Sequence, residues 1–218
     1  MLGIDRGRLV QVASRHGCVL QVLPRVGDYL PTGAPVVAVH GGAGPAAPAD
    51  ADVRRCLLLG RTRTLYQDAL YGLRQLVDVA TQALSPAVNQ PTTAVEVIHR
   101  IEDVLLRIAR RPVPTGLYVD GSGVVRLVEH QPTWAETVDL AFIEITAYGS
   151  ASPAVSARLA ATLDRLRREV PSDLQGDVAR HAEALDRILV PTAATPNPSR
   201  PDQAPDPSRT PGSGWWHS

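Results

Sequence analysis

The sequence predicts an α+β fold that is mostly helical, in which a small N-terminal β-barrel-like module precedes a helical domain with one β-hairpin. Three observations support this prediction. Apolar residues recur at helical spacing over much of residues 66–190. Short valine-rich runs separated by turn residues fill residues 18–40, and the stretch LYVDGSGVVRLV is typical of a hairpin.

Residues 1–40 are expected to form the small module. The stretch DRGRLVQVASRHG predicts a short helix with Leu9, Val10 and Ala13 on one side, ended by Gly17. The following residues predict short strands, because valines alternate with Pro24, Gly27–Asp28 and Thr32–Gly33. The segment VGDYLPTGAPVVAV resembles half of a lipoyl or biotinyl barrel, although the lysine that would carry the cofactor is absent.

The remaining residues divide into a linker, a helical domain and a tail. The Gly/Pro/Ala-rich residues 41–52 predict a linker. The helical domain is expected over 53–190, with helices at 66–84, 92–110, 133–148, 152–169 and 172–190 and the hairpin near 116–128. Residues 191–218 are rich in Pro, Ser and Asp and predict a disordered tail, in which no role is assigned to Trp215 and Trp216.

Composition excludes several classes of function. The 22 basic residues are all arginine, so lysine-dependent pyridoxal phosphate, P-loop, biotinyl and lipoyl chemistry is excluded, and no cofactor is expected. The formal net charge of zero gives no indication of nucleic-acid binding. No apolar run is long enough to span a bilayer, so the chain as given is expected to be soluble and cytoplasmic. Cys18 and Cys56 are expected to be buried and reduced, and their spacing fits no metal motif.

A corner between two helices and the charges before it form the candidate site. Ser85-Pro86 should stop the first helix and Pro91-Thr92-Thr93 should restart the second, with Asn89 or Thr92 as the cap, giving an antiparallel helical hairpin. The candidate ligand or structural residues are Arg61, Arg63, Asp68, Arg74, Asp78, Ser85, Asn89 and Gln90. A salt-bridged helix surface explains their charges more simply than a ligand does, and no metal site is expected there.

Two long stretches carry a family resemblance. RTRTLYQDALYGLRQLVDVATQALSPAVNQPTTAVEVIHRIEDVL and TWAETVDLAFIEITAYGSASPAV, together with IDRGRLVQVA and VGDYLPTGAPV, resemble a bacterial predicted-membrane-protein family catalogued as domain of unknown function 2254. The resemblance covers about residues 4–165. The family corner reads Ser-Pro-x-x-Asn-Asp-Pro-x-Thr-Ala, and this sequence has Gln90 where the family usually has Asp.

The resemblance implies an inner-membrane protein with no known reaction. In the family this region follows several membrane-spanning helices, so we expect a shortened gene product or an excised domain that meets the membrane only through those missing helices. The expected function is that of a non-catalytic domain that acts by contact with an unknown protein, with a second copy of the chain among the candidates. The alternatives are a binding module for a small anion or metabolite and a hydrolase. The hydrolase alternative rests on a Ser85–His99–Asp78 triad that nothing in the spacing supports.

Overall fold

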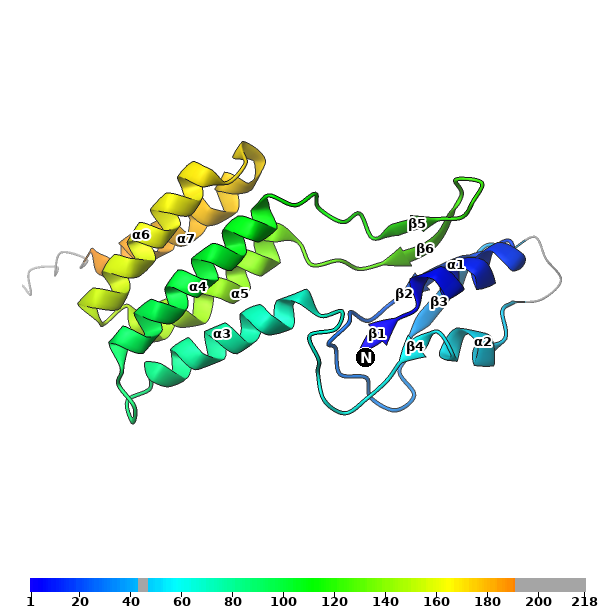
Figure 1. Ribbon diagram of the computed structural model, residues 1–218, viewed down its shortest axis with the longest axis horizontal. Helices are drawn as coiled ribbons and strands as arrows, with labels where there is room; N and C mark the ends of the chain where they lie inside the picture. The colour runs from blue at the N-terminus through cyan, green and yellow to red at the C-terminus, as the bar shows by residue number, and fades with distance from the viewer. Residues whose placement is uncertain (43–46, 191–218) are drawn as a thin grey trace, which may run out of the picture.

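The computed structural model describes residues 1–42 and 47–190. They form two lobes that lie end to end along the long axis of the molecule (Figure 1). An α/β lobe contains residues 1–42 and 47–58 and the segment Leu117–Glu129, and the other lobe is helical. The chain crosses between the lobes at residues 59–68, 110–116 and 130–133.

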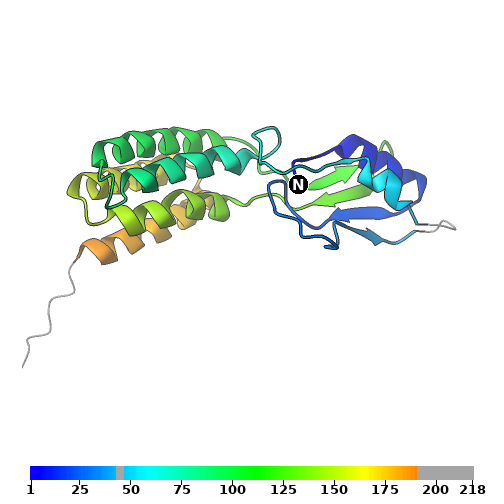
Figure 2. The same cartoon turned by 90° about the horizontal axis from the view of Figure 1, so that it is seen from below.

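The α/β lobe is a sheet with helices on one face. The strand order is β3-β2-β6-β5, made by β3 (Val37–His40), β2 (Val19–Val22), β6 (Val125–Glu129) and β5 (Leu117–Val119). Helix α1 (Arg6–Arg15) packs on the sheet with α2 (Asp50–Arg54) beside it (Figure 2). A separate antiparallel pair is formed by β1 (Gly3–Ile4) and β4 (Leu57–Leu58).

Alternating burial along β2 explains how α1 and the sheet share a core. Leu20 and Val22 are buried while their neighbours are half-buried, so one face of the strand points towards the helix. On α1, Leu9 and Ala13 lie one helical turn apart and are completely buried against this face. The helix begins at Asp5, whose carboxylate accepts a hydrogen bond from the Arg8 backbone N–H at 3.0 Å.

Three expectations about this lobe need correction. The sheet is open at β3 and β5, so it is not a closed barrel. The hairpin itself is confirmed. However, β6 pairs in parallel with β2, with Leu20 opposite Leu127, so the hairpin belongs to the N-terminal sheet and not to the helical domain. The reason is that Leu127 shares its buried face with Leu20. Finally, α2 begins at Asp50, inside the expected linker 41–52.

The helical lobe contains the five long helices that the sequence predicts between residues 66 and 190. They are α3 (Ala69–Ala83), α4 (Pro91–Ala109), α5 (Trp134–Gly149), α6 (Pro153–Glu169) and α7 (Gln175–Leu189), with the 3-10 helix η1 (Ser172–Leu174) before α7. Helices α3 and α4 form the expected antiparallel hairpin (Figure 1). None of the helices in residues 1–42 and 47–190 is long and apolar enough to cross a bilayer.

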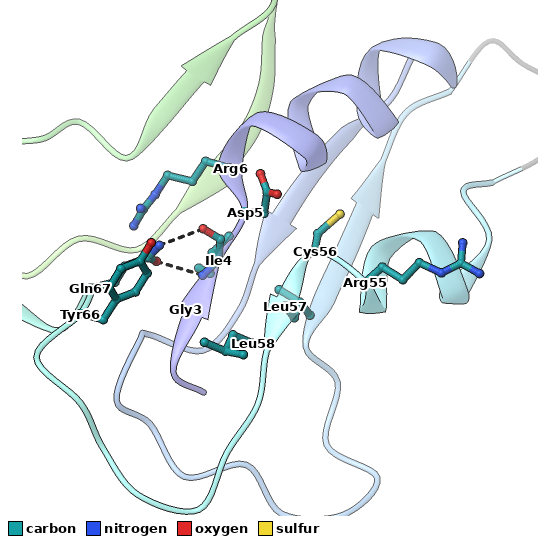
Figure 3. A pocket seen from close by; sticks show the side chains of 10 residues that line it. All are labelled: Gly3, Ile4, Asp5, Arg6, Arg55, Cys56, Leu57, Leu58, Tyr66 and Gln67. Atoms are coloured by element: carbon teal, nitrogen blue, oxygen red, sulfur yellow. Dashed lines mark hydrogen bonds between the residues drawn. The ribbon is translucent and has the colours of Figure 1, made fainter.

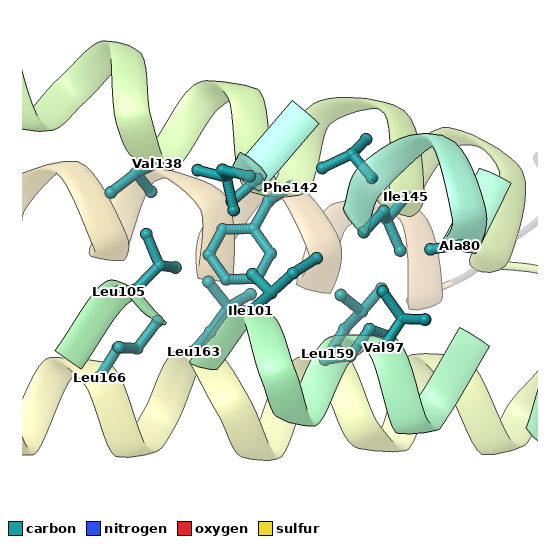
Figure 4. Packing of buried hydrophobic residues seen from close by; sticks show 14 of the residues in the cluster. Ala80, Val97, Ile101, Leu105, Val138, Phe142, Ile145, Leu159, Leu163 and Leu166 are labelled. Atoms are coloured by element: carbon teal, nitrogen blue, oxygen red, sulfur yellow. The ribbon is translucent and has the colours of Figure 1, made fainter. Parts of the chain in front are cut away.

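The core of the helical lobe is built around Phe142 of α5 (Figure 4). Ile101 of α4 and Leu163 of α6 lie beside it, and all three side chains are almost completely buried. On α4, Ile98, Ile101 and Leu105 follow the helical spacing of apolar residues and are fully buried. The predicted disordered tail 191–218, with Trp215 and Trp216, lies outside the described residues.

Candidate functional site

The helical corner is a tightly bonded turn. The Ser85 carbonyl accepts hydrogen bonds from the Val88 and Asn89 N–H groups at 3.0 and 2.9 Å, and the Gln90 N–H donates to the Ala83 carbonyl at 2.7 Å. Asn89 has a φ of 45°, a left-handed conformation that asparagine tolerates better than most residues. These bonds give Ser85, Asn89 and Gln90 a structural explanation.

The cap of α4 differs from the expectation. Gln90, and not Asn89 or Thr92, occupies the N-cap position, and its side chain makes no capping bond to the helix backbone. The Thr93 hydroxyl instead donates to the Gln90 side-chain oxygen at 3.3 Å. Aspartate is among the best N-cap residues. Helix capping therefore accounts for the aspartate expected at this position in the family, without any metal.

We expect Gln90→Asp to raise the free energy of unfolding by about 0.5–1 kcal/mol, because the carboxylate can accept from a free N–H group of α4. Urea unfolding measures the change. Gln82→Asp is the matched control, since it places the same charge near the C-terminal end of α3, where the helix dipole disfavours it. A gain that requires added Ca²⁺ would instead support a metal site at the corner.

The eight candidate residues do not form one site. Arg63, Asp68 and Arg74 line a cleft of about 250 Å³ between the lobes. Ser85, Asn89 and Gln90 lie beyond the far end of α3, which at about 1.5 Å per residue is roughly 20 Å long. Arg61 is exposed and has no ion pair among the described residues. Asp78 lies one turn beyond Arg74 and binds it.

Asp68 is the central acidic residue of the cleft. Its side chain caps α3 by accepting from the Tyr71 N–H at 3.0 Å, and it also accepts two hydrogen bonds from Arg63, at 2.9 and 2.7 Å. The Arg63 guanidinium lies 4.9 Å from the centre of the Tyr71 ring. Gly27, with a φ of 97°, lets this pair approach the α/β lobe, because a side chain there would overlap the Asp68 carboxylate.

Sequence reasoning missed most of the remaining charges in the cleft. Arg6 binds Glu129 through two hydrogen bonds, at 2.6 and 2.7 Å. Arg25 binds Glu136 of α5 at 2.6 Å and also contacts His130. Arg74 binds Glu144 of α5 as well as Asp78. Arg6 and Glu129 are 123 residues apart, and no local sequence signal connects them.

Another pair of hydrogen bonds joins the first connecting segment, residues 59–68, to β1 (Figure 3). The Gln67 side-chain oxygen accepts from the Ile4 N–H at 2.9 Å, and its amide donates to the Ile4 carbonyl at 3.2 Å. The carboxamide thus occupies the place of a neighbouring strand on the free edge of β1.

The ion pairs of the cleft favour a role in holding the two lobes together over a role in binding an anion. Arg6, Arg25, Arg63 and Arg74 each have a carboxylate partner, so little positive charge is left to attract an anion. Arg25 joins the α/β lobe to the first turn of α5, and this contact crosses between the lobes. For the hydrolase alternative, no hydrogen bond among the described residues joins Ser85 to His99 or His99 to Asp78.

The Arg25–Glu136 contact predicts a pH dependence. Hydrogen bonding to Arg25, and then to the Thr133 backbone, lowers the pKa of Glu136 from 4.5 to about 2. A carboxyl whose folded-state pKa is lowered stabilises the fold above its unfolded pKa, and this contribution disappears as the pH falls from about 4.5 to about 2. Glu136→Gln should therefore be less stable than the unmodified chain at pH 7, and the difference should shrink across this range.

Urea unfolding between pH 7 and about pH 2.5 measures this difference. Glu96→Gln is the control, because Glu96 is exposed on α4 and has no ion pair among the described residues. A stability difference for Glu136→Gln that stays constant with pH would contradict the prediction.

Comparison with known proteins places the chain in a family. A family described as predicted membrane protein (DUF2254) matches residues 1–165, which is more than half of the chain. The chain belongs to the DUF2254 family. This result confirms the resemblance seen in the sequence. No solved structure matches the chain.

Curated proteins of mycobacteria are similar to the chain. The uncharacterized proteins Rv1290c of Mycobacterium tuberculosis and Mb1321c of Mycobacterium bovis are each 37% identical to the chain over 147 residues. The matched region is 66% of this chain and 28% of each relative. The chain therefore spans a little over a quarter of the length of the relatives that it matches.

Proposed function

We propose that this chain is a non-catalytic module of a DUF2254 membrane protein and that it acts by contact with another protein. The observation that carries the proposal is a group of large apolar side chains at the end of β4 and on the first connecting segment, residues 59–68. Leu58, Leu59, Leu65 and Tyr66, here called the 58–66 patch, are between 54% and 78% exposed. Exposed apolar patches often mark protein contacts, and aromatic side chains are enriched at them.

The surroundings of the 58–66 patch support this role. Leu58 and Tyr66 line a shallow hollow together with Ile4 and Gln67 (Figure 3). The Gln67 bonds to Ile4 hold the end of the segment against β1, so that its position is fixed before a partner arrives. The charged cleft beside it is neutralised by its own ion pairs, which leaves the apolar residues as the feature available to a partner.

We also place the module on the cytoplasmic side of the membrane. Cys18 and Cys56 are free and buried, and a reducing compartment keeps thiols in this state. Since the chain covers only part of the length of its relatives, the partner can be another part of a DUF2254 protein or a second copy of this chain.

Photo-crosslinking in bacterial cells tests the contact. A benzophenone amino acid replaces Tyr66 in one variant and Tyr148 in the control, since Tyr148 is similarly exposed but lies at the far end of α5. We expect a discrete adduct from position 66 that is weakened by Leu59→Ser and absent from position 148. Mass spectrometry of the adduct distinguishes a second copy from another DUF2254 segment or a different protein. Equal or no adducts from the two positions would overturn the proposal.

A further inference from the structure

Another pocket lies at the inner end of the helical lobe, away from the 58–66 patch. It encloses about 220 Å³ between the ends of α3, α4 and α5 and the connecting segments 110–116 and 130–133. Its wall is mostly apolar and includes Leu70, Ile108, Val113, Pro132, Trp134 and Leu174. Small-molecule sites are concave, mostly apolar and frequent at such junctions.

Most polar groups in this wall are already bonded to the protein. The Trp134 indole N–H donates to the Leu174 carbonyl at 3.0 Å, and the Thr137 hydroxyl donates to the Thr133 carbonyl at 2.8 Å. Arg111 and Gln131 also line the pocket, and neither side chain has a partner among the described residues. The pocket therefore combines an apolar wall with an available cation and an available amide.

We propose that this pocket binds a small carboxylate with an aromatic or branched aliphatic body. An apolar cavity of about 150 Å³ is enough to bind benzene, so the volume here accommodates one ring with a short substituent. Arg111 supplies the charge for the carboxylate, and Gln131 supplies a neutral donor. The site is independent of the contact function proposed above, because it shares no residue with the 58–66 patch.

Nuclear magnetic resonance of the full chain tests the site with phenylacetate and its neutral isostere phenylacetamide. The indole N–H resonance of Trp134 reports on the pocket wall directly. For a ligand with about ten heavy atoms, we expect a dissociation constant of about 1 mM. We expect phenylacetate to bind about fivefold more tightly than phenylacetamide, since an exposed ion pair contributes up to about this factor.

Two variants separate the charge from the apolar wall. Arg111→Gln should weaken phenylacetate binding about fivefold and leave phenylacetamide binding within about twofold. Val113→Phe should weaken the binding of both ligands, because Val113 lines the pocket and a phenylalanine ring at this position takes up part of the volume of the pocket. Arg107→Gln is the control, since Arg107 is exposed on α4 outside the pocket and has no partner among the described residues.

The outcomes are distinct. A saturable Trp134 shift that depends on Arg111 and not on Arg107 supports the proposal. Absence of a saturable shift with either ligand at about 10 mM, or equal phenylacetate binding by the unmodified chain and Arg111→Gln, overturns it. Dispersed spectra for each variant exclude loss of the fold as the cause of lost binding.

Discussion

Replacing Glu102 by alanine is expected to lower the free energy of unfolding by about 3 kcal/mol, because it removes the acidic member of a buried ion-pair network. Only 3% of the Glu102 side chain is exposed. Its carboxylate binds Arg158, accepts from Arg165 at 2.7 Å and accepts from the Thr162 hydroxyl at 2.8 Å. These three partners lie on one face of α6, so the network joins α6 to α4.

A loss of about 3 kcal/mol is at the low end of the range for removing one partner of a buried ion pair. The Arg158 and Arg165 side chains are 22% and 47% exposed, so both can reach water when the carboxylate is removed. For a chain of this size, about 3 kcal/mol corresponds to a melting temperature lowered by roughly 6–12 °C. Calorimetry or thermal circular dichroism measures it.

Asp103→Ala is the matched control for Glu102. Asp103 is the next residue on α4, it is exposed, and its removal should change the free energy of unfolding by less than about 0.5 kcal/mol. Glu102→Gln keeps the shape and some of the hydrogen bonds, so its effect should lie between the two. Equal stabilities for Glu102→Ala and Asp103→Ala would show that the network contributes nothing.

Gly116→Ala is expected to destabilise the chain by more than about 3 kcal/mol, because two penalties act at once. Gly116 has a φ of 70°, which disfavours any side chain. An added Cβ would also overlap the backbone carbonyl oxygen of Glu129, and this carbonyl cannot rotate away like a side chain. The Gly116 carbonyl accepts from the Glu129 N–H at 2.8 Å, so relieving the overlap would disturb the hairpin.

Gly123 provides the control, since its φ is 79° but an added Cβ would meet nothing within 4 Å. Gly123→Ala should therefore cost only about 1–2 kcal/mol, from the backbone conformation alone. The difference between the two variants in urea unfolding isolates the contact with Glu129. Equal losses in the free energy of unfolding for Gly116→Ala and Gly123→Ala would contradict the close approach of Gly116 to β6.

Local sequence signals predicted the helices and the turns. Pro91 and Pro153 stand at the starts of α4 and α6, and the apolar periodicity of α4 matches its buried face. The stretch DGSG makes the hairpin turn, in which the Asp120 carboxylate accepts from the Ser122 and Val124 N–H groups at 2.9 and 3.2 Å. Each of these features depends on atoms within a few residues, so the sequence alone contains the necessary information.

The candidate site was predicted only in part, because its charges meet across the fold. Arg63, Asp68 and Arg74 do line one cleft, since they flank the start of α3. The corner residues were grouped with them by proximity in sequence, although a straight helix carries them to its opposite end. Arg165 binds the buried carboxylate of Glu102, 63 residues away, and no local sequence signal connects the two.

The sequence by itself indicated the five long helices, with ends close to the observed ones, and the family that the chain belongs to, but it missed the short helix α2. Only the tertiary structure decided that β6 pairs with β2, that Arg25 binds Glu136 between the lobes, and that Glu102 meets α6. The physical reason is that a helix or turn is stabilised by neighbours along the chain, whereas the partner of a strand edge or a buried charge depends on which faces pack together. The residues that meet in these contacts are about 55–110 positions apart in the sequence, and local periodicity carries no information about such distant partners.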